Sequence, residues 1–279
     1  MMSATNTIEM AGLKDELKGT WMAGNYDYFS RFMESSAVEF LDRLPLRRGD
    51  RLLDVACGSG QLALLAAHKG AKVTGVDIAT NWIEAARGRA ASEGLAAQFD
   101  QGDAEELPYP DESFDIVASI YGAMFAARPK RVAQELARVC RSGGTIAMAN
   151  WTKEGFIGRM FQIISRFIAP PGMPSPLLWG DESTVRQRFG DSVSHLRLTR
   201  VQYRFDYPFS PEGVVDFFRE NYGPTNRAFA ALSETDQVAL RNALMELWSG
   251  ANQSPNARRT VVNAEYLDVV ATRANRRSQ

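Results

Sequence analysis

RLLDVACGSGQL, residues 51–62, runs from an apolar segment through a glycine-rich turn into residues that favour a helix. The apolar segment predicts a buried strand. Gly58 and Gly60 predict a tight turn, because glycine lacks a Cβ atom and adopts positive φ easily. The amides of such a turn, with the positive end of a helix dipole behind them, favour a ligand above the carboxyl end of the strand. This arrangement is typical of α/β sheets that bind nucleotides.

A second short strand over residues 71–76 ends at Asp77, about 20 residues past the glycine turn. An acid at that position accepts hydrogen bonds from the ribose hydroxyls of an adenosine. The turn lacks the third glycine of a dinucleotide fingerprint, because Ala63 stands there, and it lacks the Lys-Ser/Thr pair of a phosphate loop. The pattern therefore favours an adenosine-containing ligand without a pyrophosphate.

Four motifs in order along the chain resemble those of class I S-adenosylmethionine-dependent methyltransferases, in the form seen in ubiquinone and menaquinone biosynthesis. The motifs are LDVACGSG (53–60), VDIA (76–79), GDAEELPYPDESFD (102–115), and ELARV (135–139) with the glycine pair at 143–144. Two positions depart from the family pattern. Ala56 replaces a glycine and Ser142 replaces a proline. Both residues are small, so the resemblance holds from about Arg51 to Trp151.

The resemblance implies a Rossmann-like α/β fold with a seven-stranded, mostly parallel sheet, an antiparallel last strand and a helical cap. Alternating strand and helix patterns also predict a parallel sheet with right-handed crossovers. The expected strands are 51–56, 71–77, 96–101, 115–120, 144–151, 197–207 and 260–272, and the expected helices are 61–69, 80–93, 129–141, 211–221 and 234–250.

We expect one methyltransferase domain over residues 1–279. Its parts are an N-terminal helical cap (1–45), a cofactor-binding half (46–151), a cap insertion (152–195), and the last two strands with their helices (196–279). Within the first part, residues 1–12 are expected to be loose, and a helical period runs from Leu13 to Leu44. The apolar helix of the insertion is expected to cover the substrate mouth, although a membrane-surface helix is the alternative.

The resemblance implies S-adenosylmethionine as cofactor, held at the carboxyl ends of the first four strands. Its expected contacts are Tyr26, Asp54, Ala56, Gly58, Ser59, Gly60, Asp77, Ile78, Asp103, Ala104, Ser119 and Tyr121. In this scheme Asp54 and the glycine turn hold the methionine end, and Asp77 holds the ribose. Asp103 accepts from the adenine amino group, while Ser119 and Tyr121 flank the sulfonium.

Aromatic residues precede the helical period at Trp21, Tyr26 and Tyr28. They either anchor a helix on the sheet or close over the cofactor, where a pocket that excludes water strengthens the electrostatics inside it. We favour closure over the cofactor, and we take Tyr26 and Tyr121 as the candidates for a catalytic role.

The acceptor is less defined by the sequence, because methyl transfer from a sulfonium needs mainly alignment. The two histidines, His68 near a helix end and His195 at the start of a strand, are interpreted as structural. No general base is evident, so O, N, S and C acceptors stay open. Residues that could line an apolar or aromatic pocket are Tyr121, Met124, Phe125, Trp151, Phe156, Trp179 and Tyr222.

The composition limits the classes of partner that the chain is expected to bind. With 45% apolar residues the chain can bury a full core, and its formal net charge of −1 gives no global attraction to nucleic acid or anionic membrane. Two cysteines make no disulfide framework, and the N-terminus shows no secretory signal, which favours the cytoplasm. No stretch is long and apolar enough to span a bilayer, and no metal-ligand spacing occurs.

The sequence therefore predicts an S-adenosylmethionine-dependent methyltransferase that acts on a small, apolar or aromatic metabolite. Neither a nucleic-acid partner nor a bound metal is expected, and the oligomeric state is left open. Two alternatives belong to other classes. A noncatalytic S-adenosylmethionine sensor would keep every cofactor residue, and a nicotinamide-dependent oxidoreductase would share the strand, the turn and the ribose acid.

Overall fold

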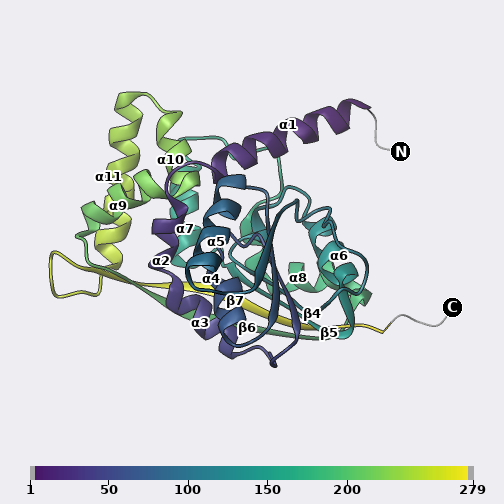
Figure 1. The fold of residues 1–279 in the computed structure, drawn as a ribbon. Coiled ribbons are helices and arrows are strands. Elements are labelled where there is room, and N and C mark those ends of the chain that lie inside the picture. The colour runs from purple at the N-terminus through teal and green to yellow at the C-terminus, as the bar shows by residue number, and fades with distance from the viewer. Residues whose placement is uncertain (1–3, 276–279) are drawn as a thin grey trace.

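A single sheet with strand order β3-β2-β1-β4-β5-β7-β6 organises the computed structural model, which describes residues 4–275 (Figure 1). β1 to β5 are parallel, and β7 runs antiparallel to both β5 and β6. The predicted fold class is confirmed. The strands are β1 (Arg51–Val55), β2 (Lys72–Asp77), β3 (Ala97–Gln101), β4 (Phe114–Ile120), β5 (Cys140–Trp151), β6 (Val193–Tyr207) and β7 (Thr260–Arg273).

Helices cover the two faces of this sheet and its end beyond β6 and β7. α3 packs on α4, α6 packs on α8, and α9 to α11 form a separate group at the left of the molecule (Figure 1). The helices are α1 (Ala4–Trp21), α2 (Tyr26–Arg31), α3 (Glu34–Asp42), α4 (Gln61–His68), α5 (Thr80–Ser92), α6 (Pro129–Val139), α7 (Phe156–Ile164), α8 (Glu182–Phe189), α9 (Pro211–Asn221), α10 (Gly223–Ala230) and α11 (Glu234–Ala251). Three short 3₁₀ helices, η1 (Ala123–Phe125), η2 (Pro176–Gly180) and η3 (Gly190–Ser192), complete the fold.

The N-terminal prediction was wrong in two respects. Residues 4–12 belong to α1 rather than to a loose segment, whereas residues 1–3 lie outside the described part of the chain. The helical period predicted from Leu13 to Leu44 is divided among three helices, because Gly24 adopts a positive φ of 74° and Asn25 caps a new helix by accepting from the Tyr28 amide.

The predicted cap insertion, residues 152–195, packs in two different places. α7 packs on α11 and β7 beside the site described below, but α8 packs on α6 and β6 and therefore covers the sheet. Trp179 of η2 is fully buried, with the Arg188 guanidinium 4.4 Å from its ring centroid, and η2 packs on β5. α10 was not predicted. Its second residue, Pro224, resembles a helix breaker in sequence but is well tolerated in a first turn. The sequence predicts a basic tail over Arg273–Gln279, and residues 276–279 of it lie outside the described part of the chain.

Candidate active site

The glycine turn between β1 and α4 has the backbone conformation that its sequence predicts. Gly58 and Gly60 have φ values of 53° and 86°, and Ala56 also lies in the left-handed region at 57°. A Cβ atom on Gly58 would lie 3.0 Å from Cε1 of Tyr26, so the ring of Tyr26 rests directly on the turn. Because left-handed backbone is costly for alanine, the surrounding structure must hold Ala56 in place.

Asp77 at the end of β2 fastens this turn. Its carboxylate accepts hydrogen bonds from the backbone amides of Gly58 and Ala79, both at 2.8 Å. Burial raises the pKa of Asp77, while these amide hydrogen bonds oppose the rise. The carboxylate also lines the cavity above the turn, where it can accept further hydrogen bonds from a ligand.

Asp54 in β1 carries an unsatisfied oxygen. Its Oδ2 accepts from the Ala63 amide at 3.1 Å, but Oδ1 is buried and has no hydrogen-bond partner among residues 4–275. Burial raises the pKa of Asp54 to about 8, and the neighbouring Asp77 carboxylate adds to the rise. A buried carboxylate oxygen without a donor fits a site whose ligand brings a hydrogen-bond donor or a positive charge.

A cavity with about 770 Å³ of empty space, solvent at its mouth included, opens above the turn. The predicted site residues in its wall are Tyr26, Ala56, Gly58, Asp77, Ile78, Asp103, Ala104 and Tyr121. Trp21, which was expected to close over the cofactor, also lines this cavity, whereas Phe125 was named only for the acceptor pocket. The sequence analysis missed as site residues Lys14, Leu17, Val76, Trp82, Gly102, Glu105, Gly122, Ala123, Ala126 and Ala127.

Four predicted site residues do not line this cavity: Asp54, Ser59, Gly60 and Ser119. The two serines form hydrogen bonds within the protein instead. The Ser119 hydroxyl donates to the Val55 carbonyl at 2.7 Å and accepts from the Ala123 amide at 2.9 Å. Ser59 is fully buried, and its hydroxyl accepts from the Gln61 side chain at 2.8 Å. These hydroxyls therefore position the backbone and do not face the ligand.

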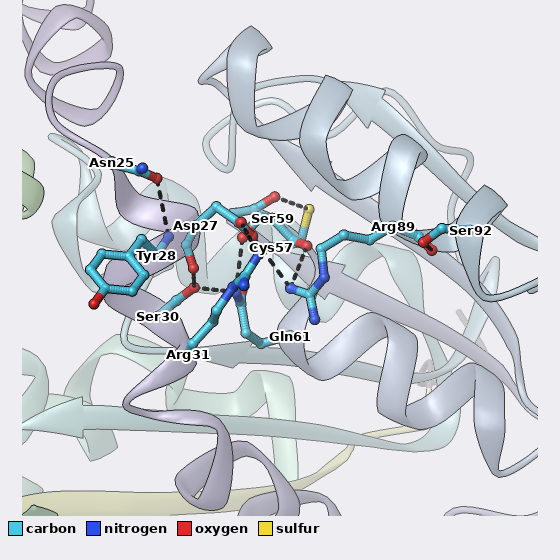
Figure 2. Close-up of polar contacts among 11 residues, drawn as sticks. Asn25, Asp27, Tyr28, Ser30, Arg31, Cys57, Ser59, Gln61, Arg89 and Ser92 are labelled. Atoms are coloured by element: carbon cyan, nitrogen blue, oxygen red, sulfur yellow. Dashed lines mark hydrogen bonds and ion pairs between the residues drawn. The ribbon is translucent and has the colours of Figure 1, made fainter.

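Of the other two, Asp54 is buried beneath the turn, and Gly60 is the residue directly before α4. Figure 2 shows how α2 and α5 reach the turn from either side: Gln61 also donates to Ser30 of α2, and Arg89 of α5 donates to the Ser59 carbonyl at 3.1 Å. Tyr28, which was expected to close over the cofactor, is 42% exposed and packs on Phe32 and Phe217 instead.

α1 crosses the mouth of the cavity. Lys14 forms ion pairs with Asp103 and, at 2.8 Å, with Glu105, whose carboxylate also binds Arg128 at 2.6 Å. Burial alone raises the pKa of Glu105, but the hydrogen bonds from Lys14 and Arg128 hold it below its ordinary value. Leu17 and Trp21 of the same helix also line the cavity, so α1 supplies one of its walls.

A second, smaller cavity lies behind the first and shares Trp21, Tyr26 and Tyr121 with it. Every side chain in its wall is aromatic or aliphatic. The wall consists of Trp21, Tyr26, Phe29, Met33, Tyr121, Trp151, Ile157, Met160, Phe205, Phe218 and Tyr222. Of the predicted acceptor-pocket residues, Tyr121, Trp151 and Tyr222 line this cavity and Phe125 lines the first. Met124, Phe156 and Trp179 are buried in the core instead.

Tyr121, like Trp21 and Tyr26, lines both cavities. Its backbone has a φ of 53°, its ring stacks on Trp151 with centroids 3.9 Å apart, and its hydroxyl lies 2.8 Å from the Ser36 hydroxyl. Ser36 comes from α3 and was not recognised from the sequence, because nothing in a helical period indicates which buried serine meets a tyrosine of a distant strand. Burial raises the pKa of Tyr121 well above its ordinary value, so its hydroxyl stays protonated.

Comparison with known proteins decides the family. Residues 53–148 match the family model described as a methyltransferase domain. Over 253 residues the chain is 37% identical to the 27-O-demethylrifamycin SV methyltransferase of Amycolatopsis mediterranei, covering 86% of each chain. The chain belongs to the class I S-adenosylmethionine-dependent methyltransferases. Its cofactor is S-adenosylmethionine, which excludes the nicotinamide alternative.

Further similarities agree with the fold. An uncharacterised protein of Mycobacterium tuberculosis is 41% identical over 194 residues, which is 69% of this chain and 71% of that one. The YcgJ protein of Bacillus subtilis superposes with a TM-score of 0.59 at 18% identity, covering 86% of this chain and 99% of that one. The [4+2]-cyclase SpnF shares the fold at a TM-score of 0.54 and 20% identity, covering 86% and 81%. The fold alone therefore does not define the reaction.

When bound, S-adenosylmethionine supplies an electrophilic methyl group, and the protein's task is binding, orientation and exclusion of water. The unsatisfied oxygen of Asp54, the glycine turn and the carboxylate of Asp77 are suited to hold it. No helix within residues 4–275 is long and apolar enough to cross a membrane. In the same range, no group of three His, Cys, Asp or Glu side chains is arranged to hold a metal ion.

Proposed function

We propose that this methyltransferase methylates an oxygen atom of an uncharged, largely apolar small molecule. The molecule binds in the second, smaller cavity, called the aromatic cavity below, and the first cavity is called the cofactor cavity. The observation that carries this proposal is the wall of the aromatic cavity. It adjoins the cofactor cavity through Trp21, Tyr26 and Tyr121, and it contains no charged side chain. A charged acceptor would lose its hydration there without gaining a partner.

The relative from Amycolatopsis supports oxygen as the acceptor atom, because its name describes O-methylation of a hydroxylated metabolite. The aromatic cavity has about 350 Å³ of empty space, open solvent included, and Trp21, Tyr26 and Tyr121 connect it to the first cavity.

For the cofactor end, we propose that Asp54 and the turn from Ala56 to Gly60 bind the methionine moiety and that Asp77 binds the ribose. Asp103, with Ile78 and Ala104, would contact the adenine. Most of these residues line the first cavity: Ala56, Gly58, Asp77, Ile78, Asp103 and Ala104. Asp54 does not line it, but its Oδ1 atom has no hydrogen-bond partner among the described side chains.

The cavity residues favour catalysis by alignment. The aromatic cavity has no His, Lys, Asp or Glu in its wall, and burial raises the pKa of both Tyr26 and Tyr121. A protonated, buried phenol is a poor general base. We therefore propose that both tyrosines orient the acceptor. The acceptor hydroxyl is acidic enough to pass its proton to water as the methyl group is transferred, so no free anion forms in the uncharged cavity.

Two measurements test this function. Calorimetric titration with S-adenosylhomocysteine and NAD should show micromolar binding of the first and none of the second. A panel of phenols, enols, alcohols, amines and thiols, with 27-O-demethylrifamycin SV included, is then incubated with S-adenosylmethionine carrying a labelled methyl group. Label on acidic hydroxyls alone supports the proposal, whereas label on amines or thiols alone refutes it.

A further inference from the structure

Two of the tyrosine hydroxyls in the aromatic cavity have no partner among the side chains that the structure describes. Tyr222 is 6% exposed, and neither its hydroxyl nor that of Tyr26 forms a hydrogen bond with any residue from 9 to 275. The ring of Tyr222 is fixed between neighbours: it stacks on Phe29 with centroids 4.9 Å apart and meets Trp21 edge-on at 5.8 Å. Its hydroxyl therefore sits on a rigid ring in a buried wall.

Three other tyrosine hydroxyls of the same region do find partners, whereas the buried hydroxyl of Tyr207 has none among residues 9–275. The Tyr121 hydroxyl pairs with Ser36 at 2.8 Å, the Tyr203 hydroxyl donates to the Phe32 carbonyl at 3.0 Å, and the Tyr266 hydroxyl accepts from Arg43 at 2.5 Å. Buried polar groups are nearly always paired, so an unpaired one calls for a reason. For Tyr222 the reason offered by the structure is its place in a cavity wall.

Tyr222 differs from Tyr26 in one useful respect. Tyr26 lines both cavities and rests on Gly58, so any change to it disturbs the cofactor turn as well. Tyr222 lines only the aromatic cavity. Burial raises the pKa of Tyr222 well above its ordinary value, so at neutral pH it presents an O–H donor.

We propose that Tyr222 is a specificity-determining residue whose hydroxyl binds an uncharged oxygen, a hydroxyl or a carbonyl, on a flat aromatic or conjugated acceptor. The proposal rests on the proposed function only in taking the aromatic cavity as the acceptor site. Aromatic rings on every side select the flat body, the lack of charged side chains excludes ions, and the hydroxyl of Tyr222 distinguishes an oxygen-bearing ligand from a hydrocarbon of the same shape.

The experiment uses two probes that differ only at one position, 4-fluorophenol and 4-fluorotoluene. Their dissociation constants are measured by fluorine NMR titration on the full chain saturated with S-adenosylhomocysteine. For each protein, the dissociation constant of the toluene divided by that of the phenol gives a discrimination ratio. Comparing this ratio between the wild type and a variant cancels the difference in hydrophobicity between the two probes, which is the same for both proteins, and leaves the contribution of the changed hydroxyl.

Tyr222→Phe removes the hydroxyl and keeps the ring contacts, so it should lower the discrimination ratio about fivefold, the effect of one hydrogen bond. Tyr207→Phe is the matched control. The Tyr207 hydroxyl is also buried without a partner among the described residues, but this tyrosine lines neither cavity. Its removal should leave the ratio unchanged.

Three outcomes overturn the proposal: the same ratio in wild type and Tyr222→Phe, an equal drop in Tyr207→Phe, or no binding of either probe to the wild type. Thermal unfolding confirms that both variants are folded, and unchanged titration with S-adenosylhomocysteine confirms that the cofactor site is intact. Since no methyl transfer is measured, failure here is distinct from failure of the proposed acceptor chemistry.

Discussion

The Nζ atom of Lys14 lies 2.8 Å from Oε2 of Glu105, a carboxylate whose side chain is 1% exposed. The same ammonium group also pairs with Asp103. At its other end α1 is fixed to α5, because the Trp82 indole donates to the Trp21 carbonyl at 2.6 Å. α1 is thus attached on both sides of the cofactor cavity, and Lys14 is the attachment on the side of Asp103.

Lys14→Met should therefore speed the release of S-adenosylhomocysteine. Glu105 keeps its hydrogen bonds to Arg128, so the fold should persist while α1 loses its link to the far side of the cavity. A partly buried, charge-assisted contact is worth about 1 kcal/mol, which corresponds to a rise of about fivefold in the dissociation rate. Stopped-flow displacement of S-adenosylhomocysteine measures that rate.

Lys18→Met, one turn further along the same helix, is the control for this experiment. Lys18 does not line the cavity, and it forms no ion pair with any residue between 4 and 275. Equal dissociation rates for the two variants would show that the ion pairs of Lys14 do not hold the helix closed.

Asp77→Ala should weaken binding of S-adenosylhomocysteine by more than tenfold. The change removes the acceptor for the Gly58 and Ala79 amides, and with it the proposed contact to the ribose. The proposed hydrogen bonds from the ribose hydroxyls to the Asp77 carboxylate are worth about 1.5–3 kcal/mol each. Their loss exceeds the 1.4 kcal/mol that corresponds to a factor of ten in affinity. Calorimetric titration measures the affinity. Asp77→Asn keeps one acceptor oxygen, so its affinity should lie between those of the wild type and Asp77→Ala. Wild-type affinity in the alanine variant would refute the proposed site.

Asp54 should make the stability of the cofactor-free protein depend on pH. Its pKa is about 8 when folded, against about 3.9 in an unfolded chain. Between these values the native state binds the proton more tightly, so the stability contributed by the protonated form is lost as the pH rises through about 8. The free energy of unfolding should fall by up to about 1.4 kcal/mol per pH unit in this window.

Asp54→Asn provides the comparison for that pH dependence. The amide keeps an acceptor for Ala63 and carries no ionisable proton, so the variant should lose less stability than the wild type between about pH 5 and about pH 8. Urea unfolding of both proteins at intervals across this range measures the difference. Parallel curves for the two proteins would mean that Asp54 is ionised throughout.

The part of the site that could be predicted from sequence is local. Glycines next to a strand, and an acid at the end of the next strand, determine their own surroundings within a few residues, so Gly58 and Asp77 lie where they were expected. Ser119 was predicted from family position alone. Whether its hydroxyl faces a ligand depends on the Val55 carbonyl, which lies 64 residues away on another strand.

The missed residues are those that distant segments bring to the site. Lys14 is separated by 89 residues from Asp103, and α1 has no distinct apolar stripe to show which face docks. Trp179 was named as a possible pocket residue but lies in the core, for a related reason. A tryptophan in a proline-rich loop suits a pocket as well as a core, and only the packing of η2 on β5 decides between them.

The hydrogen bond between Ser36 and Tyr121 yields the last prediction. Ser36→Ala leaves the Tyr121 hydroxyl buried without a partner, which should lower the free energy of unfolding by about 1–3 kcal/mol. Adding Tyr121→Phe removes the unpaired group, so the double variant should regain most of that loss. Urea unfolding of the wild type, the two single variants and the double variant gives the coupling free energy directly.

The neighbouring serine supplies the matched control. Ser35 also lies near a tyrosine hydroxyl, that of Tyr203 at 3.3 Å, but Tyr203 has a second partner in the Phe32 carbonyl at 3.0 Å. Ser35→Ala therefore leaves no buried hydroxyl unpaired, and it should change the stability by less than about 0.5 kcal/mol. Similar losses for Ser35→Ala and Ser36→Ala would attribute the effect to α3 as a whole. A loss specific to Ser36 would assign the effect to its hydrogen bond with Tyr121.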